Sequence, residues 1–264
     1  MNATATYQHP QPLCKVSGGE TASSPSSLAF ADKYDVDHAQ QYDQKHPETL
    51  ASRLSNWREQ HLARQALIDA GNPDSVLDLP CGAGRFWPLL AERSHRQIYA
   101  ADNSADMLQV ALTNQPPQLA ERVIPFRTSA FAINLPDSSV DNIFCMGLLH
   151  HIEQPEQRRA ILREFHRVTR DTVVLSLWVD GNYKAWRRRK LERKRAAEHP
   201  GETNHNRLVI SRTEIEQEFQ QAGFKIVNHR NFLIGYAMWR IYTLRKENNN
   251  EIPFSNLQQQ PDQK

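Results

Sequence analysis

The chain has 264 residues, 39% of them hydrophobic, which is enough for one large domain with extended ends or for two small domains. Its 32 basic and 30 acidic residues leave a net charge of only +2, which excludes a polycation that coats nucleic acid, and its three scattered cysteines exclude a disulfide framework or a zinc-binding spacing. No apolar run is long enough to span a membrane and no signal-peptide pattern is present, so we expect a cytoplasmic protein.

Both ends of the chain have the composition of disordered segments. Residues 1–30 are rich in Ser, Thr, Gln, Pro and Gly, and residues 246–264 are rich in Asn, Gln and Lys. We therefore predict a disordered leader, one domain over residues 31–245 and a disordered tail. Residues 34–43 mix aromatic and acidic side chains, and one interpretation of this segment is a short helix packed on the edge of the domain.

Residues 48–70 have the spacing of an amphipathic helix, which Gly71 and Pro73 then end. The apolar residues expected on its packed face are Leu50, Leu54, Trp57, Leu62, Leu67 and Ile68. His61 falls on the same face, and we interpret it as a packed histidine at the edge of the core rather than as a catalyst.

The stretch after this helix has the pattern of a strand, a turn of small residues and a second helix. Residues 75–79 read as a buried strand, and Asp78 stands four residues before Gly82 and six before Gly84. The glycines let the backbone approach a ligand closely, and the helix expected over residues 85–93 offers free N–H groups at its start. Neither a dinucleotide fingerprint nor a phosphate-binding loop is present. A carboxylate at this position suits a ligand that carries positive charge.

A second acidic residue ends the next predicted strand. Residues 97–102 form an apolar strand that ends in Asp102, and Ser104 is a suitable N-cap for the helix that follows. An acid at the end of the second strand of a nucleotide-binding α/β sheet is placed to accept hydrogen bonds from a ribose diol.

The run from Asp78 to Gly84 resembles motif I of the class I S-adenosylmethionine-dependent methyltransferases, with Pro80 in the place of the first family glycine. The resemblance implies an α/β fold, a doubly wound Rossmann-like sheet of seven strands in which strand seven is antiparallel and lies beside strand five. It implies S-adenosylmethionine as the cofactor, with the methionine moiety at the glycine turn and the ribose at Asp102. It also suggests a second interpretation of segment 34–43, a lid in which Tyr34 contacts the substrate.

The predicted third and fourth strands extend the resemblance. Strand three covers residues 123–128, and Ser129 follows where the family often has an acid that contacts adenine, so that contact falls to Ser129 and the backbone of Ala130. Strand four begins at residue 141, and its Leu-His-His-Ile ending is similar to that of the ubiquinone and menaquinone methyltransferases. One of His150 and His151 could act as a general base, and the alternative is that both support the loop by hydrogen bonds.

The cofactor-binding residues that we expect from these motifs come from the ends of the first four strands and the segments that follow them. They are Asp78, Pro80, Cys81, Gly82, Gly84, Asp102, Asn103, Met107, Ser129, Ala130 and Met146. Cys81 is interpreted as a small, semi-buried residue rather than as a nucleophile, and no metal site is expected.

An amphipathic helix over residues 155–168 and a fifth strand over 171–178 precede a basic stretch, residues 184–195. In the family this region commonly builds the substrate lid, which we place at residues 178–210. The candidate substrate contacts there are Trp178, Tyr183, Trp186, Arg187 and Arg188. The basic stretch is either a docking surface for an anionic partner, such as a lipid head group, a phosphorylated metabolite or RNA, or a solvated helix face.

Three further elements complete the predicted domain. Ser211 and Glu214 have the spacing of a capping box at the start of a helix that Gly223 ends, and strands six and seven follow at residues 224–230 and 237–245.

The sequence therefore predicts an S-adenosylmethionine-dependent methyltransferase that acts on a small-molecule or lipid-like, anionic acceptor. It is expected in the cytoplasm, with peripheral attachment at the inner membrane face if the partner is a lipid. One alternative is an RNA methyltransferase that docks through residues 184–195. The other is a non-catalytic module that binds the cofactor and presents the basic stretch to a partner.

Overall fold

The computed structural model describes residues 49–198 and 208–247. The predicted leader, Tyr34 with its segment and residues 248–264 lie outside the described residues. Strand β7 continues through Lys246, the first residue of the predicted tail. Among the described residues, no helix is both long and apolar enough to cross a bilayer.

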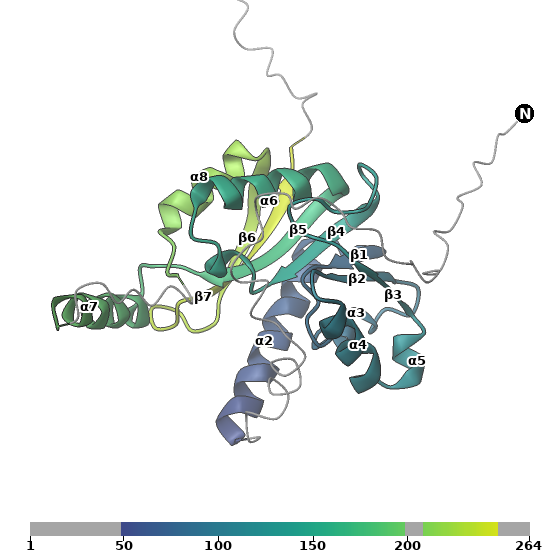
Figure 1. Cartoon of the computed structure of the whole chain (residues 1–264), viewed down its shortest axis with the longest axis horizontal. Coiled ribbons are helices and arrows are strands. Elements are labelled where there is room, and N and C mark those ends of the chain that lie inside the picture. The colour runs from purple at the N-terminus through teal and green to yellow at the C-terminus, as the bar shows by residue number, and fades with distance from the viewer. Residues whose placement is uncertain (1–48, 199–207, 248–264) are drawn as a thin grey trace, which may run out of the picture.

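Seven strands form one mixed sheet in the order β3-β2-β1-β4-β5-β7-β6 (Figure 1). Their bounds are β1 Ser75–Asp78, β2 Gln97–Asp102, β3 Val123–Arg127, β4 Val140–Met146, β5 Thr169–Trp178, β6 Phe224–Asn231 and β7 Trp239–Lys246. The first five strands are parallel, and in the register Leu77 lies opposite both Tyr99 and Ile143. β7 is antiparallel to β5 and β6 and lies between them. The predicted doubly wound, seven-stranded fold is confirmed.

Helices cover both faces of this sheet (Figure 1). Their bounds are α2 Leu50–Asp69, α3 Trp87–Leu90, α4 Ala105–Asn114, α5 Pro117–Ala120, α6 Pro155–Val168, α7 Tyr183–Glu198 and α8 Arg212–Gln221, with a 3-10 turn, η2, at Leu149–His151. α6 and α8 lie on one face, whereas α2, α3 and α4 lie on the other. α7 projects away from the sheet, and within the basic stretch Ala185, near the start of the helix, is buried.

The alternation of side chains along each strand divides the interior into two cores. Leu77, Ile143 and Val173 pack with α6 and α8, while their neighbours Val76 and Phe144 pack with α2 and α3. Because both faces are covered, the central strands are almost continuously apolar, as parallel sheets require.

The prediction for the packed face of α2 is wrong for its first half and for Ile68, which is 48% exposed. Leu50, Leu54 and Trp57 are 84%, 65% and 61% exposed. The helix instead packs through its second half, where the buried residues are Leu62, Ala63, Ala66 and Leu67, together with Glu59 nearer the middle. Small alanines let α2 approach β6 and β7 closely, and a search for large apolar residues at helical spacing passes over them.

The predicted capping box of α8 is also wrong. Ser211 is the N-cap residue, but its side chain makes no capping hydrogen bond, and the N–H of Arg212 donates to Asp180 Oδ1 at 2.9 Å. Glu214 instead accepts from Arg158 Nη2 at 2.6 Å, across the α6–α8 contact. Because Glu214 pairs with the buried guanidinium of Arg158, it does not complete a capping box at the start of α8. At α4 the predicted cap is confirmed, because Ser104 Oγ accepts from the N–H of Met107 at 3.2 Å.

We predict that Gly84→Ala destabilises the fold more than Gly71→Ala. Both glycines have positive φ, +73° and +82°, which costs an alanine about 1–2 kcal/mol. Only at Gly84 would the new Cβ lie 2.9 Å from the buried ring of Trp87, which adds about 1–3 kcal/mol of overpacking. Chemical denaturation of both variants measures the difference, and equal free energies of unfolding would contradict the close approach of Trp87.

Candidate functional site

A cavity of about 560 Å³ opens at the carboxyl ends of the parallel strands. It is lined by the segments that follow β1, β2, β3 and β4, by α2 on one side and by residues 232 and 237–239 between β6 and β7 on another. This is the edge at which open α/β sheets bind their ligands. The predicted site residues that line it are Pro80, Cys81, Gly82, Asp102, Asn103, Met107, Ser129, Ala130, Met146, His150, His151 and Trp178.

The other predicted site residues do not line the cavity. Asp78 and Gly84 are buried behind its wall. Four candidate substrate contacts lie on α7 and do not line the cavity, namely Tyr183, Trp186, Arg187 and Arg188. Their neighbour Lys184 does line it.

The carboxylate of Asp102 ties two of the lining segments together. Its Oδ2 accepts from the N–H of Gly82 at 3.0 Å, and its Oδ1 accepts from the N–H of Ser104 at 3.0 Å. Burial raises the pKa of Asp102, and these backbone hydrogen bonds act in the opposite direction by stabilising the ionised form. Each oxygen accepts one of these two bonds and has a second lone pair, so the group can also accept from a diol.

The carboxyl group of Asp78 is among the most buried charged groups of the described chain, with 1% of the residue exposed. Burial, and next the charge of Asp102, raise the pKa of Asp78 well above its ordinary value. Its Oδ2 has no hydrogen-bond partner among the described residues. Two neighbouring acids, one of them incompletely satisfied, form an environment that a cationic ligand would stabilise.

The turn between these acids is shaped by glycine and by a neutral thiol. Gly82 has φ of +52° and lines the cavity with its backbone. A Cβ added at this position would lie 3.7 Å from the end of the Met107 side chain. Burial, and next the charge of Asp78, raise the pKa of Cys81, so its side chain is a protonated thiol. This agrees with its interpretation as a small, semi-buried residue. The helix after the turn is shorter than the predicted 85–93, since α3 covers only Trp87–Leu90.

An ion pair that the sequence analysis missed closes the cavity on the side of α2. Arg85 donates from Nη1 to Glu59 Oε2 at 2.6 Å and from Nη2 to Glu59 Oε1 at 3.0 Å, and both residues line the cavity. The two-point contact fixes α2 against the glycine turn. A glutamate between apolar helix positions gives no local signal that it will pair with a distant arginine. Its spacing from Ser55 and Leu62 does place these three residues on one helix face.

Aromatic rings build the side of the cavity near the end of β5. The ring of His150 stacks on Trp178, with centroids 5.0 Å apart and planes at 8°, and meets the edge of Trp239 at 5.6 Å. The ring of His151 is tilted by 35° to it, with the two centroids 4.3 Å apart. His150 is 3% exposed and its carbonyl accepts from the N–H of Leu208 at 2.7 Å. This packing agrees with the supporting role that the sequence left open, and both rings also border the cavity.

Ser129 stands at the end of β3 with its hydroxyl turned toward its own loop. Its Oγ accepts from the N–H of Phe131 at 3.2 Å, and Thr128 Oγ1 donates to the carbonyl of Ala132 at 3.0 Å. These bonds hold the backbone of Ser129 and Ala130 along the cavity wall.

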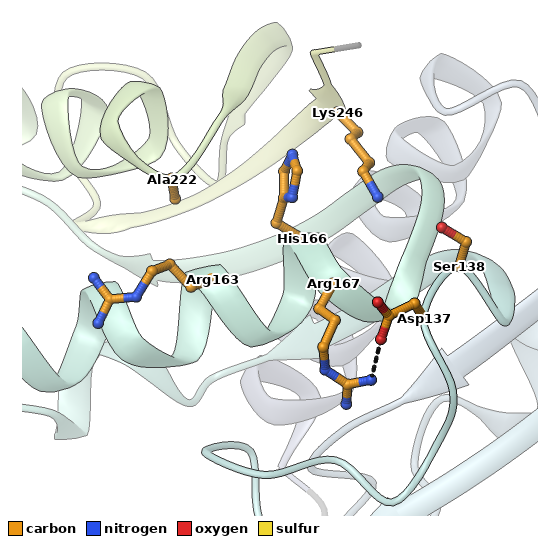
Figure 2. Close-up of a pocket in the computed structure, with 7 residues that line it drawn as sticks. All are labelled: Asp137, Ser138, Arg163, His166, Arg167, Ala222 and Lys246. Carbon is orange, nitrogen blue, oxygen red and sulfur yellow. Dashed lines mark hydrogen bonds and ion pairs between the residues drawn. The ribbon is translucent and has the colours of Figure 1, made fainter. Parts of the chain in front are cut away.

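A second cavity, of about 380 Å³, lies at the opposite edge of the sheet, near the start of β5 (Figure 2). It is lined by Arg163, His166, Arg167 and Lys246 with Asp137, and Arg167 Nη1 pairs with Asp137 Oδ1 at 2.8 Å. None of its lining residues was predicted to belong to a site. Within the described part of the chain, no group of three or more His, Cys, Asp or Glu residues could hold a metal ion.

Comparison with known proteins agrees with this geometry. Residues 76–172 match the model of a family described as a methyltransferase domain. An uncharacterized methyltransferase of Schizosaccharomyces pombe is 32% identical over 103 residues, which is 39% of this chain and 38% of that protein. The chain spans between 27% and 38% of the length of the curated relatives it matches first.

Two solved structures share the fold over most of both chains. One is the magnesium protoporphyrin IX methyltransferase of Synechocystis PCC 6803 with bound SAH (TM-score 0.64, 15% identity, 83% of this chain and 98% of that one). The other is an S-adenosylmethionine-dependent methyltransferase of Aquifex aeolicus (TM-score 0.55, 21% identity, 80% and 99%).

We predict that Asp78→Asn gains stability relative to the wild type as pH rises. A carboxyl whose pKa is raised in the folded state stabilises the fold below the unfolded pKa, about 4, and this contribution is lost as pH rises toward the folded value. The amide does not ionise and escapes this loss. Thermal unfolding from pH 4 to pH 7 should therefore show a growing difference in Tm between variant and wild type.

The control for this experiment is Asp106→Asn, which removes an exposed carboxylate from the first turn of α4. A difference between Asp78→Asn and the wild type that stays constant with pH would contradict the raised pKa of Asp78.

Proposed function

We propose that this chain, whose residues 76–172 match the model of a methyltransferase domain, binds S-adenosylmethionine in the cavity and transfers its methyl group to a small-molecule or lipid-like acceptor. The observation that supports this most is the meeting of the Gly82 turn, the acid Asp102 and an aromatic wall in one cavity, with the buried carboxyl of Asp78 behind the turn.

The half of the cavity near β1 and β2 suits the cofactor. The glycine turn leaves room for the methionine moiety, whose positive groups would favour the ionised form of the nearby carboxyl of Asp78. Asp102 accepts from the ribose hydroxyls while it keeps its bonds to Gly82 and Ser104. Asn103, Met107, Ser129 and Ala130 bound the space for adenine.

The half near β4 and β5 would hold the acceptor. When bound, S-adenosylmethionine supplies an electrophilic methyl group on a sulfonium. The part of the protein is to align the acceptor and to exclude water. The ring of His150 contacts those of Trp178 and His151, so it can position an acceptor atom, and His151 is the less buried of the two and better placed to take a proton.

The lining of that half favours a largely apolar acceptor with an anionic group. Phe131, Leu148, Phe232 and Trp239 surround the space with apolar surface, and Lys184 reaches the lining from α7. One cation beside apolar walls suits a lipid-like molecule that carries a negative head, which is the acceptor class expected from the sequence.

We predict that Asp102→Ala weakens binding of S-adenosylhomocysteine by roughly ten- to one-hundred-fold. The change removes charge-assisted hydrogen bonds, worth about 1.5–3 kcal/mol, to the ligand and to the loop that contacts it. Isothermal titration calorimetry measures the loss. The matched control, Asp106→Ala on the same helix start, should bind like the wild type.

Saturable binding by the wild type, followed by transfer of labelled methyl to an extracted small molecule, would support an enzyme. Binding of S-adenosylhomocysteine without transfer of labelled methyl to any extracted small molecule would support the non-catalytic module instead. Folded wild type that binds no S-adenosylhomocysteine would contradict the proposal altogether.

A further inference from the structure

An exposed apolar and aromatic surface lies where α7 meets the loop between β6 and β7. We call it the α7–loop surface, and its apolar members are Tyr183, Trp186, Leu233, Ile234 and Tyr236. Ile234 is 87% exposed and Trp186 58%. Such side chains cost free energy in water, so a cluster of them on one surface indicates a partner.

The loop and the start of α7 are held together by backbone bonds. The N–H of Tyr183 donates to the carbonyl of Gly235 at 2.9 Å, and the N–H of Lys184 donates to that of Tyr236 at 3.0 Å. Inside the loop, the N–H groups of Tyr236 and Ala237 donate to the carbonyl of Leu233. The loop is therefore a closed turn that presents Leu233 and Ile234 outward.

Ring contacts join the two segments into one row. Tyr183 stacks on Tyr236 with centroids 5.8 Å apart, and Tyr183 meets Trp186 at 6.0 Å. Ala185, 1% exposed, anchors the helix at this end. The aromatic row therefore has a defined position on the domain.

Cations surround the row. Lys184 Nζ lies 5.2 Å from the ring centre of Tyr236, and Lys190 Nζ lies 5.5 Å from that of Trp186. Residues 183–194 of α7 carry one acid, Glu192, among their Lys and Arg residues. The exposed face is thus strongly positive, and its partner should be anionic.

We propose that the α7–loop surface docks on an anionic lipid membrane. Aromatic rings beside Lys and Arg are typical of segments that lie in the membrane interface, and the aliphatic tip can enter the acyl boundary. Single-stranded RNA would use the rings and the cations, but it offers no apolar environment for Leu233 and Ile234. The aliphatic tip therefore favours lipid over RNA.

The surface adjoins the mouth of the cavity. Lys184 and Phe232 belong to the same two segments and line the cavity itself. Docking would thus bring the acceptor half of the cavity against the bilayer, from which a lipid-like acceptor can enter. This last step rests on the proposed function, whereas the docking does not.

The test is co-sedimentation of the full chain with vesicles of phosphatidylcholine alone or mixed with phosphatidylglycerol. Binding should require the anionic lipid. Ile234→Glu should weaken it by about tenfold or more, since burial of one isoleucine is lost. Arg187→Glu combined with Lys190→Glu should weaken it by a similar factor and reduce its dependence on salt.

The matched control is Leu54→Glu, which makes the same kind of change at a 65% exposed position on α2. It should bind vesicles like the wild type, and all variants should bind S-adenosylhomocysteine equally, which separates loss of docking from loss of the cofactor site. Equal loss in Leu54→Glu and Ile234→Glu, or binding to transfer RNA with none to anionic vesicles, would overturn the proposal.

Discussion

The carboxylate of Asp102 holds together the edge of the sheet at which the site is built. It ends β2, accepts from Gly82 in the turn after β1 and accepts from Ser104 at the start of α4. Parallel strands bring their carboxyl ends to one edge, and the segments that leave β1 and β2 lead to α3 and α4 on the same face of the sheet. A buried anion between two such segments fixes their separation, and that separation defines the space that the cavity offers to a ligand.

This arrangement has a cost within the fold. Asp78 is buried beside Asp102, and the two like charges make the ionised form of Asp78 unfavourable without a ligand. The surroundings are correspondingly tight: Gly84 leaves space for the ring of Trp87, and Arg85 anchors the turn to Glu59 on α2. A well-packed scaffold therefore keeps in place a pair of neighbouring acids whose ionised forms a cationic ligand would stabilise.

The two halves of the cavity are built by different means. The cofactor half consists of short segments between regular strands, each fixed by hydrogen bonds to its neighbours. The acceptor half depends on parts outside the regular alternation, namely α7 and the loop between β6 and β7, which come together through Tyr183 and Gly235. Because these parts lie outside the two cores, their side chains can differ without disturbing the sheet, and under the proposed function acceptor choice would reside there.

The sequence by itself predicted the fold class, the resemblance to methyltransferases and the residues proposed for the ligand edge, because these depend on local patterns: an apolar strand, an acid at its end and a glycine turn. It did not determine which face of α2 packs, since alanines rather than large residues make that contact. Nor did it reveal the pairing of Glu59 with Arg85, of Arg158 with Glu214, or of α7 with the loop at residues 233–236. Those contacts join residues far apart in the chain. Only the tertiary structure could decide them, because a charge or an exposed ring carries no local sign of the partner that the fold will bring to it.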